Sequence, residues 1–154
     1  MVTDSIRDGC GECGSVLVFD EERVIIDLLA VVLKREGYVV TTAARHEEAL
    51  ESFSRGTFDL AITDLGLHNG HGGHLVRKIK EISPRTAIVS MAAYPTAEIQ
   101  RFAEEHTAAF LAKPFDISEL LAAVRGALEG KSVKESAPVR GGALGRRAPV
   151  AAVS

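Results

Sequence analysis

Three acidic residues and one lysine stand at the ends of short apolar runs in this chain. Asp20 and Glu21 follow the first run, Asp64 closes the third and Lys113 follows the fifth. If these runs are parallel strands of one sheet, their carboxyl ends lie at one edge and the four side chains converge there. Carboxylates bind divalent cations, and an ammonium group neutralises phosphoryl charge. The residues therefore predict a site for a divalent cation and a phosphoryl group.

The elements that must position these residues alternate along the chain. Short apolar or β-branched runs predict strands over residues 16–19, 38–43, 60–63, 86–91 and 109–111. Helical patterns cover residues 22–36, 47–54 and 74–82, a short segment from residue 95, and residues 117–128. This alternation predicts an α/β fold, a doubly wound sheet of five parallel strands with helices on both faces.

Local signals mark several helix faces and ends. The helix over 22–36 is predicted to bury four residues and to stop at Gly37 in a left-handed cap; the four are Val24, Leu28, Val31 and Val32. Asp116 and Glu119 match a capping box at the start of the last helix.

Length and composition indicate one globular domain. The chain has 154 residues, of which 46% are apolar and 25% charged, with a formal charge of −3. We expect a leader over 1–15, a domain over 16–130 and a disordered basic tail over 131–154. No apolar stretch is long enough to span a membrane, and the amino terminus lacks a secretory signal. These features predict a cytoplasmic protein that binds neither nucleic acid nor membrane.

Ordered motifs then identify a resemblance to a known family, the receiver domain of two-component response regulators. The matching segments are Val16-Leu17-Val18-Phe19-Asp20-Glu21-Glu22, Glu48-Ala49-Leu50, Asp64 with Gly72 eight residues on, and Lys113-Pro114-Phe115. The resemblance covers about residues 16–128. It implies the flavodoxin-like fold of the chemotaxis regulators, (βα)5 with strand order 2-1-3-4-5.

The resemblance also implies a role for each site residue. Asp64 would accept a phosphoryl group from a histidine kinase or phosphotransfer protein, and Lys113 would contact the phosphoryl oxygens. Asp20, Glu21, Asp64 and the backbone carbonyl of Gly66 would hold Mg²⁺. Lys113-Pro114 would be a cis peptide bond. The chain would then not be an enzyme beyond slow loss of its own phosphoryl group.

Two departures from the family pattern affect this expectation. Ala92 stands where the family usually has a Thr or Ser hydroxyl that bonds the phosphoryl group and, through the loop that follows, moves an aromatic residue, here Phe110. Ser90 could replace that hydroxyl only if the strand register were shifted by two residues. Glu21 replaces the usual second Asp and is longer by one methylene. We therefore expect phosphorylation with weakened or differently connected output.

Three functions remain open from the sequence. The first is a phosphorylatable single-domain response regulator that acts through protein contacts. The second is a degenerate receiver that works as a phosphorylation-independent interaction module, and the third is a Mg²⁺-dependent phosphohydrolase on a similar fold. A partner protein or a second copy would contact the helix carrying Tyr94, Ile99 and Phe102, unless these side chains simply belong to the core.

Cysteine and histidine patterns suggest two further, weaker sites. Cys10 and Cys13 form a single C-x-x-C, which is more typical of incidental cysteines in a flexible arm than of redox or metal chemistry. His68, His71 and His74 recur every three residues in a Gly-rich stretch. They could bind zinc, but exposed loop histidines are the simpler interpretation, because a metal ligand needs fixed geometry. His46 and His106 are isolated in the sequence.

Overall fold

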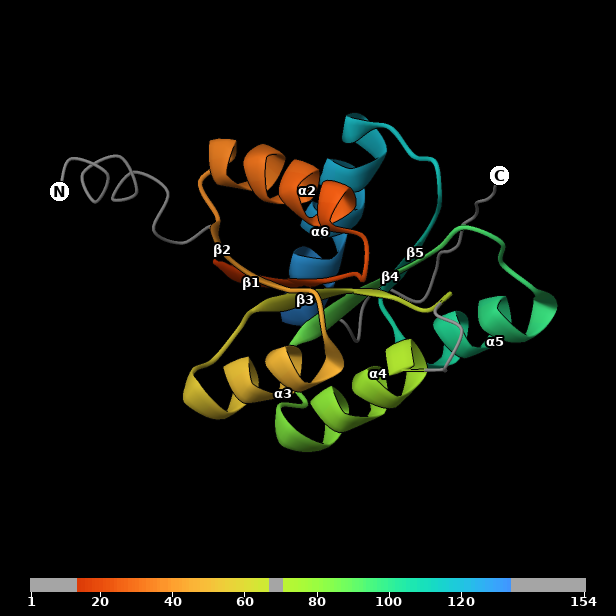
Figure 1. The fold of residues 1–154 in the computed structure, drawn as a ribbon, viewed down its shortest axis with the longest axis horizontal. Helices are drawn as coiled ribbons and strands as arrows, with labels where there is room; N and C mark the ends of the chain where they lie inside the picture. Colours follow the sequence, from red (N-terminus) through yellow and green to blue (C-terminus); the bar gives the residue numbers. More distant parts are fainter. Residues whose placement is uncertain (1–13, 67–70, 134–154) are drawn as a thin grey trace, which may run out of the picture.

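A computed structural model describes residues 14–66 and 71–133 of the chain. Strands and helices alternate throughout this part (Figure 1). The strands are β1 (Ser15–Phe19), β2 (Val39–Ala43), β3 (Leu60–Asp64), β4 (Ala87–Ala92) and β5 (Ala109–Ala112). The helices are α2 (Arg23–Arg35), α3 (His46–Arg55), α4 (His71–Ile82), α5 (Ala97–His106) and α6 (Ile117–Val133). Among the described helices, none is long and apolar enough to cross a membrane.

The five strands form one parallel sheet in the order β2-β1-β3-β4-β5. Helices α2 and α6 cover one face, and α3, α4 and α5 cover the other (Figure 1). The predicted fold and strand order are confirmed. Because all strands run in the same direction, their carboxyl ends share one edge of the sheet, where Asp20, Asp64 and Lys113 lie at or just beyond the ends of β1, β3 and β5.

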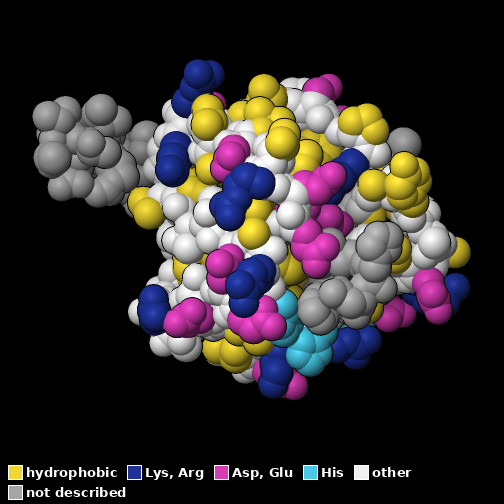
Figure 2. Space-filling view, viewed as in Figure 1, with side chains coloured by type: hydrophobic (Ala, Val, Ile, Leu, Met, Phe, Trp, Pro, Cys, Tyr) yellow, Lys and Arg dark blue, Asp and Glu magenta, His cyan; other side chains and the backbone are white. Residues whose placement is uncertain are grey.

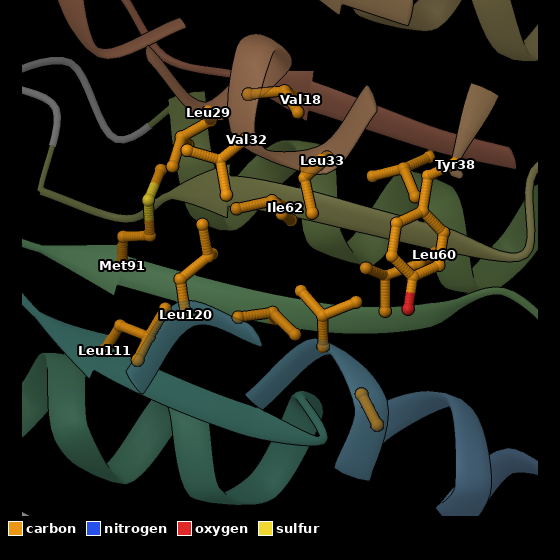
Figure 3. Close-up of a cluster of buried hydrophobic side chains, with 14 residues drawn as sticks. Val18, Leu29, Val32, Leu33, Tyr38, Leu60, Ile62, Met91, Leu111 and Leu120 are labelled. Atoms are coloured by element: carbon orange, nitrogen blue, oxygen red, sulfur yellow. The ribbon is translucent and has the colours of Figure 1, made fainter. Parts of the chain in front are cut away.

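Each strand supplies alternate side chains to two hydrophobic clusters, one on each face of the sheet. Val18 and Ile62 pack with Leu29 and Leu120 between the sheet and helices α2 and α6 (Figure 3). The cluster on the opposite face contains Leu17, Phe19, Ala49, Phe53, Leu75, Val76 and Ile79. This alternation is the period-two geometry of a strand, and it also decides toward which face each site residue projects.

The predicted inward face of α2 is wrong for three of its four residues. Val24, Leu28 and Val31 are 76%, 52% and 49% exposed, and only Val32 of the predicted set is buried. The residues that α2 does bury are Ile26, Leu29, Ala30, Val32 and Leu33. Apolar residues surround most of this helix, so periodicity alone could not select the face that meets the sheet.

Helix ends follow their predicted signals in two cases. Gly37 has a φ of 99°, the left-handed conformation that suits glycine after a helix. Asp116 Oδ1 accepts a hydrogen bond from Glu119 N at 2.8 Å, and Glu119 Oε1 accepts one from Asp116 N at 2.9 Å, which is the predicted capping box.

Other helix ends differ from the prediction. Helix α4 begins at His71, three residues earlier than predicted, and α6 continues to Val133, past the predicted domain boundary at 130. Helix α5 begins at Ala97, where Thr96 Oγ1 caps the Ile99 amide at 3.1 Å. The rest of the predicted leader and tail lies outside the described residues.

Candidate functional site

Lys113 connects two buried carboxylates at the carboxyl edge of the sheet. Its Nζ lies 2.7 Å from Asp20 Oδ2 and 2.9 Å from Asp64 Oδ2. Asp20 is fully buried, and Asp64 is 6% exposed. The structure thus brings together three of the four residues that the sequence places at this edge.

Strand periodicity explains why these three side chains meet. Val18, Ile62 and Leu111 all pack on the side of α2 and α6, and Asp20, Asp64 and Lys113 each lie two residues further along. The three polar side chains therefore project on the same side as those apolar residues, just beyond the hydrophobic cluster. The Lys113-Pro114 peptide bond is cis, as the resemblance implied.

Backbone amides hold the second oxygen of each carboxylate. Glu22 N donates to Asp20 Oδ1 at 2.9 Å, and Gly66 N donates to Asp64 Oδ1 at 2.8 Å. Each carboxylate therefore accepts one bond from an amide two residues ahead and one from the lysine. These contacts fix the orientation of both groups in advance, which reduces the reorganisation that a bound ligand requires.

The electrostatics of the site follow from burial and the single cation. Burial raises the pKa of Asp20 above its ordinary value, although the Lys113 ammonium and the Glu22 amide oppose that shift. Burial also lowers the pKa of Lys113, but its hydrogen bonds with Asp20 and Asp64 outweigh that effect and hold the pKa above the usual lysine value. Lys113 is accordingly a protonated ammonium group at neutral pH.

The two glutamates after Asp20 differ in their relation to the site. Glu21, a predicted metal ligand, has an exposed side chain. Glu22 Oε1 lies 3.7 Å from Lys113 Nζ. The sequence analysis did not predict this contact. The signal that could have found it is the Asx turn, in which the Glu22 amide bonds Asp20 Oδ1 and so keeps Glu22 close to the site. Glu22 is also largely exposed, so its contribution to the charge balance is screened by solvent.

The donor set fits a hard divalent cation held by few protein ligands. Within residues 14–66 and the described side chains after 72, no three His, Cys, Asp or Glu residues are arranged as a metal site. Asp20 and Asp64 are nevertheless two adjacent buried carboxylates, and Mg²⁺ is typically held by one or two carboxylates with waters completing its octahedron. Mg²⁺ would compete with Lys113 for these oxygens.

Ala92 lies beside Asp64 but has no hydrogen-bonding group. It is the last residue of β4 and is fully buried. A Cβ placed on Gly66 would be 3.6 Å from the Ala92 Cβ and 3.4 Å from Asp64 Oδ1, so these three residues surround the same space.

Ser90 does not supply the missing hydroxyl. Its Oγ lies 3.0 Å from Thr107 Oγ1 and donates to the Ala109 carbonyl at 3.2 Å, on the face covered by α5. Ser90 pairs in register with Phe110, which is half-buried against the cluster on the side of α3, α4 and α5. The strand register of the sequence prediction therefore holds here.

Other predicted sites are only partly described. Cys10, Cys13 and His68 lie outside the described residues. His74 lies in α4, and the structure brings it next to His46 of α3, with 5.0 Å between ring centroids. Of the predicted contact residues, Tyr94 is 88% exposed, whereas Ile99 and Phe102 are partly buried against the core.

Comparisons with known proteins agree with this fold. Residues 16–125 match the family model described as the response regulator receiver domain. The chain belongs to that family.

Individual relatives include both longer and similarly sized proteins. The chain is 34% identical over 139 residues to the response regulator protein PilR of Pseudomonas aeruginosa, covering 89% of this chain and 31% of PilR. It is 31% identical over 118 residues to sporulation initiation phosphotransferase F of Bacillus subtilis, covering 76% of this chain and 95% of that protein. A receiver domain protein (CheY-like) from Methanospirillum hungatei JF-1 superposes with a TM-score of 0.73 at 26% identity, covering 78% of this chain and 97% of that one.

The chain spans less than a third of the length of the first curated relatives, which include the DNA-binding transcriptional regulator NtrC of Azospirillum brasilense (31% identity over 137 residues, 88% of this chain and 28% of that protein).

Proposed function

We propose that this receiver domain accepts a phosphoryl group on Asp64 from a histidine kinase or phosphotransfer protein and signals through protein contacts. The contact of Lys113 with both Asp20 and Asp64 supports this proposal most directly. It joins two carboxylates and a cation in one hydrogen-bonded group, and phosphoryl transfer to Asp64 would use one carboxylate as the nucleophile and the cation to balance charge.

In the proposed transfer, a carboxylate oxygen of Asp64 forms a bond to phosphorus as the bond between phosphorus and the donor's imidazole nitrogen breaks. The bonding electron pair leaves with that nitrogen. Lys113 then balances the charge on the phosphoryl oxygens, and the Gly66 amide keeps Asp64 oriented. The product is one acyl phosphate per chain, so the domain is a phosphoryl acceptor with slow self-dephosphorylation and not an enzyme with turnover.

We propose Mg²⁺ as the cofactor of this site, with Asp20, Asp64 and the Gly66 carbonyl as protein ligands. When bound, Mg²⁺ neutralises charge on the transferring phosphoryl group. Glu21 is the weakest member of the predicted ligand set, because its side chain is exposed. It would bind through a coordinated water or after a rotamer change.

Acetyl phosphate tests phosphorylation without a partner protein. The intact mass of the chain is measured after incubation with acetyl phosphate and MgCl₂, beside Asp64→Asn and the control Asp27→Asn, whose carboxyl is exposed on α2. We expect one phosphate-sized adduct per chain in the parent and in Asp27→Asn, lost in Asp64→Asn and with excess chelator. An adduct that survives Asp64→Asn would refute Asp64 as the acceptor.

Ala92 favours a second candidate, a degenerate receiver whose partner contacts do not depend on phosphorylation. The residue removes the hydroxyl through which the end of β4 would sense the phosphoryl group. The mass experiment separates the two functions. Failure to form any adduct across a range of Mg²⁺ concentrations, with a folded protein, would make the phosphorylation-independent module the better assignment.

A further inference from the structure

Helices α3 and α4 bring two histidines from distant parts of the chain into contact. His46 is the first residue of α3, and His74 lies in the first turn of α4. Their ring centroids are 5.0 Å apart, with an angle of 40° between the ring planes. The space-filling view shows histidine side chains together on the surface at the level of these two helices (Figure 2).

The ring separation is compatible with a shared metal ion. A zinc ion lies about 2.0–2.1 Å from an imidazole nitrogen, and tetrahedral angles then place two ligand ring centroids about 5 Å apart. At this separation the two rings could share one ion if a nitrogen of each ring faced it. His74 is exposed, so water can reach the pair from that side, whereas His46 Nε2 is buried.

The chemistry of the pair selects a different ion from the one proposed for the acidic site. Neutral imidazole nitrogens suit Zn²⁺, Ni²⁺ and Cu²⁺, whereas carboxylate and carbonyl oxygens suit Mg²⁺.

We propose that His46 and His74 form a transition-metal site that joins α3 to α4. The site is independent of Asp64 phosphorylation, since none of its ligands belongs to the acidic site. Because the two ligands come from different helices, a bound ion would hold α3 and α4 together and stabilise the folded chain in proportion to ion concentration.

Titration calorimetry with Zn²⁺ and with Ni²⁺ tests this site in the full chain carrying Cys10→Ser and Cys13→Ser, which removes competing thiolates. The variants His46→Gln and His74→Gln are compared with the control His106→Gln. His106 is a partly exposed histidine that packs against Phe102 on α5, with 4.5 Å between ring centroids. Thermal unfolding with and without the ion gives a second readout and shows whether each variant folds.

We expect one ion per chain. The dissociation constant should rise by at least about tenfold in His46→Gln and in His74→Gln and should not change in His106→Gln. The ion should raise the unfolding temperature of the parent and of His106→Gln only. Loss of binding in His74→Gln with His46→Gln unchanged would place the ion elsewhere on α4 and overturn the pairing. Equal effects of all three variants, or no binding in the parent, would also overturn it. Should His46→Gln not fold, His46→Asn takes its place beside His74→Gln, and unchanged binding in His46→Asn would overturn the pairing.

Discussion

At the residue scale, the site is a buried pair of carboxylates that shares one ammonium group. The carboxyl groups of Asp20 and Asp64 share the single positive charge of Lys113. Glu22 adds a negative charge, screened by solvent, with its Oε1 3.7 Å from Lys113 Nζ. Removing carboxylates from water costs free energy that one cation only partly offsets. The site therefore has a local excess of negative charge, which a divalent cation would relieve.

This imbalance predicts a pH-dependent gain in stability for Asp20→Asn. Burial raises the pKa of Asp20 in the folded state. The ionised carboxyl therefore lowers the stability of the folded state once the pH exceeds the pKa of an ordinary Asp, about 3.9. The free energy of unfolding in urea, measured without divalent cations, should increase more for Asp20→Asn relative to the parent at pH 7 than at pH 3.

Asp27→Asn, which alters an exposed carboxyl on α2, should show no such difference between the two pH values. A gain for Asp20→Asn that is the same at pH 3 and pH 7 would argue against a burial cost on the ionised carboxyl.

Ala92 predicts where the response to phosphorylation stops. No hydroxyl at the end of β4 can bond a phosphoryl group on Asp64, so amide protection on phosphorylation should stay near Asp64–Gly66 in the parent. Ala92→Thr places a hydroxyl in the space shared with Gly66 and Asp64. Its phosphorylated form should also protect amides over 93–97, as hydrogen exchange with mass spectrometry can measure.

Ala93→Thr is the matched control, because residue 93 is exposed and next in sequence. Extended protection in the parent itself, equal to that of Ala92→Thr, would show that the signal leaves β4 without a hydroxyl.

At the element scale, α2 has the most unexpected surface. Val24, Leu28 and Val31 repeat at helical spacing and are all exposed, and α2 begins three residues after Asp20. Figure 2 shows hydrophobic side chains grouped over α2 and α6. Under the proposed function, a phosphoryl donor protein would place its histidine at Asp64, so its remaining contacts would fall on elements beside that edge of the sheet. The α2 stripe begins beside this edge and offers an exposed apolar surface for those contacts.

Leu28→Glu should therefore separate two routes of phosphorylation. A charge in the middle of the stripe should slow transfer from a phosphorylated kinase or phosphotransfer protein by at least about tenfold, as expected for loss of a central interface contact. Phosphorylation by acetyl phosphate should be unchanged, because Asp64 and Lys113 are intact. Rates of adduct formation by intact mass measure both routes.

Ile82→Glu is the control, since Ile82 is equally exposed but ends α4, away from the carboxyl edge of the sheet. An equal slowing by Ile82→Glu, or of the acetyl phosphate reaction by Leu28→Glu, would show that the stripe is not the docking surface.

At the scale of the whole molecule, the central sheet lies between two hydrophobic clusters, which predicts that the domain unfolds as one cooperative unit. Leu33 is fully buried on the side of α2 and α6, and Ile79 on the opposite side. Leu33→Ala and Ile79→Ala should each lower the free energy of unfolding by about 2–5 kcal/mol. Both should act on a single transition, because every strand contributes to both clusters.

Urea unfolding followed by circular dichroism tests this, with Ile82→Ala as an exposed control expected to change stability by less than about 0.5 kcal/mol. Two separated transitions in either core variant would contradict the single unit.

The sequence by itself determined the α/β alternation, the end of α2 at Gly37, the capping box of α6 and the meeting of Asp20, Asp64 and Lys113 at one edge of the sheet. These are local properties. Strand and helix periods, glycine conformation and a residue's place at the end of an apolar run depend on neighbours a few positions away, and parallel pairing then sends the strand ends to one edge.

Only the tertiary structure decided which side of α2 faces the sheet and that His46 meets His74. It also decided that the Glu22 side chain lies near Lys113, whereas Glu21, the predicted metal ligand, is exposed. Each of these depends on how elements far apart in the sequence pack against one another. An evenly apolar helix offers no local preference for one face, and residues 46 and 74 become neighbours only because α3 and α4 cover the same side of the sheet.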